Sequence, residues 1–215
     1  EKNNLGLLNN SNIGRSWKDV ENIVGLSSHK KISREIAEKS ITLVKNDLNI
    51  IPFIPNHYNK VSHILLSTDN DLRTRLQSIT KDINYIHGNV NTIYVNDSLT
   101  SLGIQDIINK VSKSDIIIVS MLIRISMDKG LSTIHLSHDN LLKELEKIGI
   151  PSIGISFGSP YLPSYDVFDA YLCTYGYGSI SLNATTDALF GRKNIVGRLP
   201  ITLNNEYKIG HGIRV

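Results

Sequence analysis

The chain has 215 residues, of which 40% are hydrophobic and 20% are charged, and its formal net charge is +3. A chain of this size and composition can bury one substantial core, so we expect a single globular domain or a piece of a larger enzyme. The positive charge is small and dispersed, which argues against a nucleic-acid partner. No apolar run reaches the roughly 20 residues of a membrane helix, so no membrane span is expected.

Residues 1–28 are rich in Asn, Ser and Gly, and they predict a connecting segment. This segment carries apolar side chains that could dock on another body, namely Leu5, Leu7, Leu8 and Trp17. The sequence starts at Glu1 without the charged and then apolar pattern of a signal peptide, so any signal peptide would lie outside these residues. Localisation therefore stays open between cytoplasmic and secreted.

A helix is predicted next, capped by Ser33. Apolar or small side chains recur in it at three- and four-residue spacing, which places one stripe on a helix face: Ile36, Ala37, Ser40, Ile41 and Val44.

Strands and helices then alternate along the chain. The apolar runs predict strands at 61–67, 92–95, 115–122, 150–156 and 170–174, and the segments between them predict helices at 69–79, 102–111, 137–148 and 180–190. The run at 115–122 has no polar alternation, which is typical of a parallel strand covered on both faces. We therefore expect an α/β fold, a three-layer α/β/α sandwich with a mostly parallel sheet, to which 201–203 could add an edge strand.

The helix at 137–148 has the clearest boundaries. Ser137 can cap its start, Gly149 follows its end, and Pro151 opens the next strand. The single cysteine, Cys173, lies in an apolar strand and is interpreted as a core residue rather than a nucleophile.

Three patterns suggest chemistry but lack the context that it needs. Gly154-Ile-Ser156-Phe-Gly158 matches a serine-hydrolase elbow, with Asp187 and His211 following in the required order. Two prolines after it prevent the helix that an elbow requires, so a serine hydrolase is not expected. In the segment His135-Leu-Ser-His138-Asp139 the histidines form a pair without a third metal ligand at defined spacing, and these polar residues are expected to face water. No glycine-rich phosphate loop occurs, and we expect neither a cofactor nor a metal.

Several motifs in order resemble glycoside hydrolase family 3, in particular the C-terminal α/β domain of its β-N-acetylhexosaminidase branch. The strongest of these motifs are Phe157-Gly-Ser-Pro-Tyr161, Leu189-Phe-Gly191 and Gly197-Arg-Leu-Pro200. The segment Glu35–Asn46 is similar to the helix that opens the family's second domain, and the resemblance extends over residues 2–213. It implies that residues 1–28 are the linker from a missing N-terminal (β/α)8 barrel and that residues 29–215 are the C-terminal domain.

The resemblance also locates the chemistry of the family. The nucleophile of a retaining glycosidase would come from the barrel, so no catalytic residue is expected in this chain. In the β-glucosidase branch a glutamate in the loop after the third strand is the acid/base, yet this chain has no Glu from Asp115 to Lys143. The hexosaminidase branch uses a His-Asp pair on a barrel loop instead. The same loop offers three polar groups that could touch a sugar, Arg124, Asp128 and Lys129.

We therefore expect the C-terminal domain of a retaining, exo-acting β-N-acetylglucosaminidase, which supports the barrel and lines its sugar cleft. Its partners would be that barrel and, through it, a β-linked N-acetylglucosamine oligosaccharide. Two alternatives remain open. One is a β-glucosidase-type member in which Asp128 replaces the glutamate, and the other is a standalone α/β module without catalytic function.

Overall fold

A computed structural model describes residues 17–67, 70–96, 98–125 and 133–215 of the chain. It divides the chain into two compact units, residues 1–35 and residues 36–215. The first unit contains the short helix α1 (Trp17–Glu21) and the start of helix α2 (Ser27–Ser40). Gly25, with φ of 75°, allows the turn between these two helices. The second unit holds the end of α2 and the whole α/β sandwich.

The predicted helix near Ser33 is correct in kind but wrong in its boundaries. Helix α2 begins six residues earlier and ends at Ser40, and strand β1 (Thr42–Asn46) follows directly. Leu43 and Val44 are buried in two different core clusters, one on each face of the sheet. The three-residue spacing of Ile41 and Val44 led to their prediction as part of the helix. The segment is buried from both sides instead, so its apolar residues do not mark one helix face.

Six strands form one sheet in the order β1-β6-β5-β4-β2-β3. Its other strands are β2 (Val61–Ser67), β3 (Val90–Val95), β4 (Ile116–Ile123), β5 (Ser152–Gly158) and β6 (Ala170–Cys173). All neighbouring pairs are parallel except β1 with β6. The mostly parallel sheet is thus confirmed, and each predicted strand from residue 61 to residue 174 lies within two residues of the observed one.

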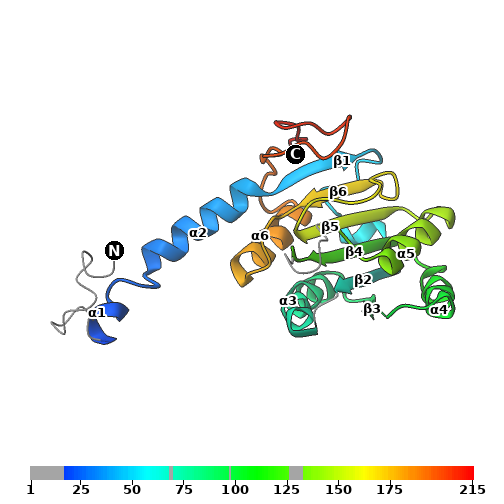
Figure 1. Cartoon of the computed structure of the whole chain (residues 1–215), viewed down its shortest axis with the longest axis horizontal. Coiled ribbons are helices and arrows are strands. Elements are labelled where there is room, and N and C mark those ends of the chain that lie inside the picture. Colours follow the sequence, from blue (N-terminus) through cyan, green and yellow to red (C-terminus); the bar gives the residue numbers. More distant parts are fainter. Residues whose placement is uncertain (1–16, 68–69, 97, 126–132) are drawn as a thin grey trace, which may run out of the picture. The chain divides into compact units, whose positions relative to one another are not determined.

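Two helical layers cover the sheet (Figure 1). Helices α3 (Asn70–His87) and α6 (Ser179–Leu189) contribute to the core on one face, and α4 (Ser101–Val111) and α5 (Leu136–Lys147) contribute to the core on the other. The three-layer sandwich is therefore confirmed. Helix α3 is longer than predicted, and the cap of α5 is His135 rather than Ser137, because the His135 side chain accepts a hydrogen bond from the Ser137 N–H.

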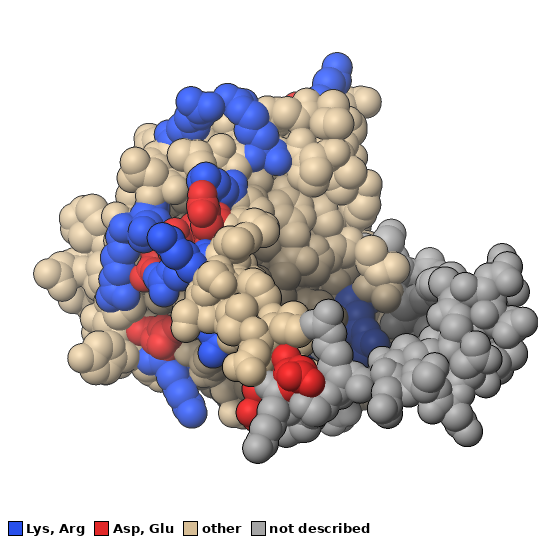
Figure 2. Space-filling view, turned by 90° about the vertical axis from the view of Figure 1, so that its left-hand side faces the viewer, with Lys and Arg blue, Asp and Glu red and all other residues tan. Residues whose placement is uncertain are grey.

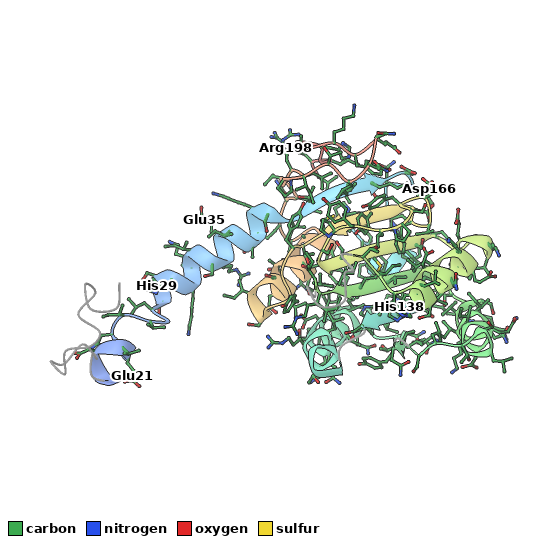
Figure 3. All side chains as sticks on the ribbon, in the orientation of Figure 1. Glu21, His29, Glu35, His138, Asp166 and Arg198 are labelled. Atoms are coloured by element: carbon green, nitrogen blue, oxygen red, sulfur yellow. The ribbon has the colours of Figure 1, made fainter. Side chains whose placement is uncertain are left out.

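The C-terminal segment lies along β1 without forming a strand at 201–203. The N–H of Ile213 donates to Leu43 O at 2.8 Å, and the N–H of Gly197 donates to Ile41 O at 3.1 Å. A Cβ on Gly197 would lie 2.3 Å from that Ile41 oxygen, so the Gly-Arg-Leu-Pro motif needs its glycine for this close approach. Arg198 holds the segment by donating from Nη1 to Gly210 O at 2.8 Å (Figure 3). The segment thereby pairs with an otherwise open sheet edge.

Cys173 is fully buried in β6, where burial raises the pKa of its thiol to about 12. A thiol with so high a pKa is not a nucleophile near neutral pH. The interpretation of Cys173 as a core residue is confirmed.

Candidate functional site

The five parallel strands all end at one edge of the sheet. Open α/β sheets bind their ligands outside this carboxyl edge, because the loops that leave the strands converge there. Figure 2 views the chain from the side toward which these strands run in Figure 1. By this general rule, a ligand of the domain is expected at the carboxyl edge.

The ends of β4 and β5 are joined by a tight backbone contact. The N–H of Ser159 donates to Ile123 O at 2.9 Å, and Gly158 adopts a φ of 95° to make this possible. A Cβ on Gly158 would lie only 2.4 Å from the same Ile123 oxygen. The contact holds the start of the next loop, so Arg124, which is exposed, lies at this edge as the sequence predicted. Asp128 and Lys129, the other two predicted contacts, lie outside the described residues.

The far end of that loop is also held. The hydroxyl of Thr133 donates to Tyr161 O at 2.9 Å, and His135 caps the helix that follows. His138 in the first turn of α5 donates from Nε2 to Asn96 O at 2.8 Å, which links α5 to the loop after β3 (Figure 3). Backbone and side-chain hydrogen bonds thus fix both ends of the loop to the carboxyl edge.

The expectation that His135, His138 and Asp139 face water is wrong for two of the three. His138 and Asp139 are buried, and Asp139 forms an ion pair with Lys143 at 2.7 Å. Helix α5 packs these side chains against the end of the sheet, a placement that the local sequence does not reveal. No group of three or more His, Cys, Asp or Glu in the part of the chain that the structure describes could hold a metal ion.

At this edge the described residues form a hollow of about 20 Å³ beside Met121, Arg124 and His138, which is room for a single water molecule at most. A larger open groove of about 910 Å³ runs between α4 and α5, and its lysines Lys143 and Lys147 already pair with Asp139 and Glu144. The described part of the carboxyl edge therefore offers a surface on which a ligand could lie.

The serine-hydrolase pattern does not form a catalytic site. Ser156 lies inside β5, is fully buried, and donates to Leu172 O at 3.4 Å. No helix follows β5, and His211 donates from Nε2 to Val44 O at 2.7 Å. The side chains of Ser156 and His211 are thus held by backbone carbonyls of different strands. The lack of a helix in residues 159–169 agrees with the prediction made from the two prolines after the motif.

The turn after β6 was not predicted from the sequence as a functional feature. Tyr175 there has a φ of 58°, which is strained for a residue other than glycine. Its hydroxyl donates to Thr42 Oγ1 at 3.1 Å, and Tyr177 lies two residues further on. The signal that could have found it is Tyr175-Gly-Tyr-Gly178 directly after a predicted strand, because the loop that follows a parallel strand lies at the carboxyl edge.

Comparison with protein families identifies the domain. Residues 41–210 match the model of the glycosyl hydrolase family 3 C-terminal domain, which is most of the chain. The chain belongs to this family. A sequence comparison with curated proteins gives no match. No helix among the described residues is long and apolar enough to cross a membrane.

Solved structures share the fold at low sequence identity. The chain is similar to the beta-glucoside phosphorylase BglX, with a TM-score of 0.73 and 18% identity over 96% of this chain and 38% of that one. It is similar to a β-glucosidase from Listeria innocua in complex with glucose, with a TM-score of 0.70 and 17% identity over 94% of this chain and 30% of the other. For a family 3 β-N-acetylglucosaminidase from Paenibacillus sp. str. FPU-7 the TM-score is 0.63 and the identity 16%, over 94% of this chain and 37% of that one.

This family 3 domain thus spans well under half of each of these structures. Both β-glucosidases and β-N-acetylglucosaminidases occur among the similar structures. At such low identity the likeness concerns the fold, which the two activities share.

Proposed function

We propose that the chain is the C-terminal domain of a retaining, exo-acting β-N-acetylglucosaminidase whose catalytic (β/α)8 barrel belongs to the same protein. The observation that carries this proposal is the composition of the loop after β4. In the β-glucosidase branch this loop would supply a glutamate as acid/base, but the sequence has no Glu from Asp115 to Lys143. A retaining enzyme needs a proton donor about 5 to 5.5 Å from its nucleophile, so the donor would come from a barrel loop instead.

The domain would support the barrel and line one side of its sugar cleft. Exposed apolar side chains favour a partner, because an interdomain surface left bare presents such groups to solvent. In the N-terminal part they are Ile23, Val24, Leu26, Ile32 and Ile36. In the α/β sandwich Leu102, Ile125 and Leu136 are 83%, 62% and 70% exposed, and all three lie where β3 and β4 lead into α4 and α5. The Leu5–Trp17 part of the predicted docking segment lies outside the described side chains.

We expect the isolated chain not to hydrolyse an aryl N-acetyl-β-glucosaminide, whereas the whole natural protein should do so with retention of configuration. The physical reason is that the nucleophile and the proton donor would both lie in the barrel. The measurement is release of the aryl group, with an aryl β-glucoside as the competing substrate. Turnover by the isolated chain that an Asp128→Asn change abolishes would overturn the proposal. A preference of the whole protein for the glucoside would favour the β-glucosidase alternative, and a natural protein without a barrel would favour the standalone module.

In the whole enzyme, Arg124→Ala is expected to lower kcat/KM by about ten- to a hundredfold. A charge-assisted hydrogen bond to a sugar hydroxyl is worth roughly 1.5 to 3 kcal/mol, and its loss appears directly in transition-state binding. Asp128→Ala and Lys129→Ala test the other two polar groups of the loop in the same assay. Lys113→Ala is the matched control, because Lys113 is an exposed cation before the opposite end of the same strand. Unchanged kinetics in all three loop variants would leave the domain as a structural brace alone.

A further inference from the structure

The turn from β6 to α6, Thr174–Gly178, is a rigid part of the carboxyl edge. The hydroxyl of Thr174 donates to Ser156 O at 2.9 Å, and the N–H of Gly176 donates to Thr174 O at 2.7 Å. The Tyr175 hydroxyl ties the turn to β1 through Thr42. Tyr175 itself is held at a positive φ of 58°, a conformation that is strained for a residue with a side chain. Surroundings that enforce such strain are frequent at ligand-binding sites.

The rigid turn presents Tyr177 next to the loop that carries Arg124. Gly158 lies between Tyr177 and the end of β4. A Cβ atom on Gly158 would be 3.9 Å from Tyr177 Cδ1 and 2.4 Å from the carbonyl oxygen of Ile123, the last residue of β4. Arg124 is the next residue after that carbonyl. Tyr177 is half-buried and packs partly against the core under α3 and α6, which fixes its ring. The Tyr177 ring therefore lies beside the end of β4, from which the loop that begins with Arg124 leaves the sheet.

We propose that Tyr177 is a substrate-contact residue, whose ring packs against the apolar face of a sugar ring while Arg124 holds one of its hydroxyls. This inference rests on the proposed function, which places a sugar cleft over the carboxyl edge. A tyrosine ring is suited to the role because it is a flat apolar surface with a weakly negative face, against which the C–H groups of a pyranose can pack. The Gly176 and Gly178 backbones on either side add no side chain that would cover the ring.

The experiment compares three variants of the whole natural protein. Tyr177→Leu keeps apolar volume against the core but removes the aromatic face, and it should weaken binding of N-acetylglucosamine, measured by calorimetry, about tenfold. Its KM for the aryl glycoside should rise by a similar factor. Tyr177→Phe keeps the ring and should stay within about threefold of the parent. Tyr85→Ala is the control, because Tyr85 on α3 is 90% exposed and away from this edge.

The outcomes separate the two proposals. Equal sugar affinity and KM in Tyr177→Leu and the parent, with thermal unfolding unchanged, would overturn the role of Tyr177 whichever sugar is preferred. Loss of affinity in Tyr177→Phe as well as in Tyr177→Leu would also overturn it, because the ring would then not be the contact. A preference for glucose with the tenfold loss intact would keep Tyr177 as a contact and reject only the N-acetylglucosaminidase assignment.

Discussion

Replacing Gly158 with alanine is expected to destabilise the chain by about 2–5 kcal/mol, the sum of backbone strain and a steric overlap. Gly158 has a φ of 95°, a conformation that alanine adopts only with strain. The new Cβ would also lie 2.4 Å from the Ile123 carbonyl oxygen, which is backbone and cannot rotate away. The ends of β4 and β5 would have to separate, breaking the hydrogen bond from Ser159 to Ile123.

Urea unfolding of the parent and the variant measures this loss of stability. Gly149→Ala is the matched control, since Gly149 also has a positive φ, 66°, but nothing lies within 4 Å of the added Cβ. The control should cost about 1–2 kcal/mol, from strain alone. If Gly158→Ala costs no more than Gly149→Ala, the close approach of the two strand ends does not constrain this position. In the whole enzyme the same variant should impair sugar binding, because it displaces the segment that carries Arg124.

Stability is expected to fall as the pH is lowered from about 6.5 toward 3, because of one buried histidine. His63 on β2 is fully buried, and its Nε2 and Nδ1 lie 2.9 Å from Ser120 Oγ and 3.4 Å from Thr80 Oγ1. Burial lowers the pKa of His63 to about 3. The unfolded chain therefore takes up a proton near pH 6.5, while the folded chain stays neutral at this site. Protonation favours the unfolded state throughout this range, at a cost of about 1.4 kcal/mol per pH unit.

Denaturant unfolding at several pH values between 7.5 and 4 tests this dependence. His63→Gln removes the titration while keeping polar atoms near Ser120 and Thr80, so its stability should depend less steeply on pH by about that slope. His57→Gln, a change at an exposed histidine, is the control and should follow the parent. Parallel stability curves for His63→Gln and the parent would show that His63 does not govern the acid sensitivity of the domain.

Local patterns in the sequence were sufficient for much of the fold. The apolar runs that form β2 and β4 are buried along their whole length. A short run of this kind is typical of a parallel strand that is covered on both faces of the sheet. Helix α5 was equally clear, because an apolar periodicity and Gly149 delimit it. The position of Arg124 followed from the same reasoning, since a residue directly after a parallel strand must lie at the carboxyl edge. The ordered motifs correctly indicated the family.

Contacts between distant residues decided what the sequence left open. Ile41 and Val44 fit a helix by spacing alone, but the pairing of β1 with β6 and with the C-terminal segment makes Thr42–Asn46 a strand, and Ile41 lies just before it. His138 is polar, yet it is buried because Asn96, 42 residues away, accepts its hydrogen bond. Tyr177 and Ile123 become neighbours only through the strand order, which places the ends of β4, β5 and β6 side by side. The spacing of apolar residues in the sequence shows which face of a helix or strand is apolar. Which other element packs against that face depends on the tertiary structure of the whole domain.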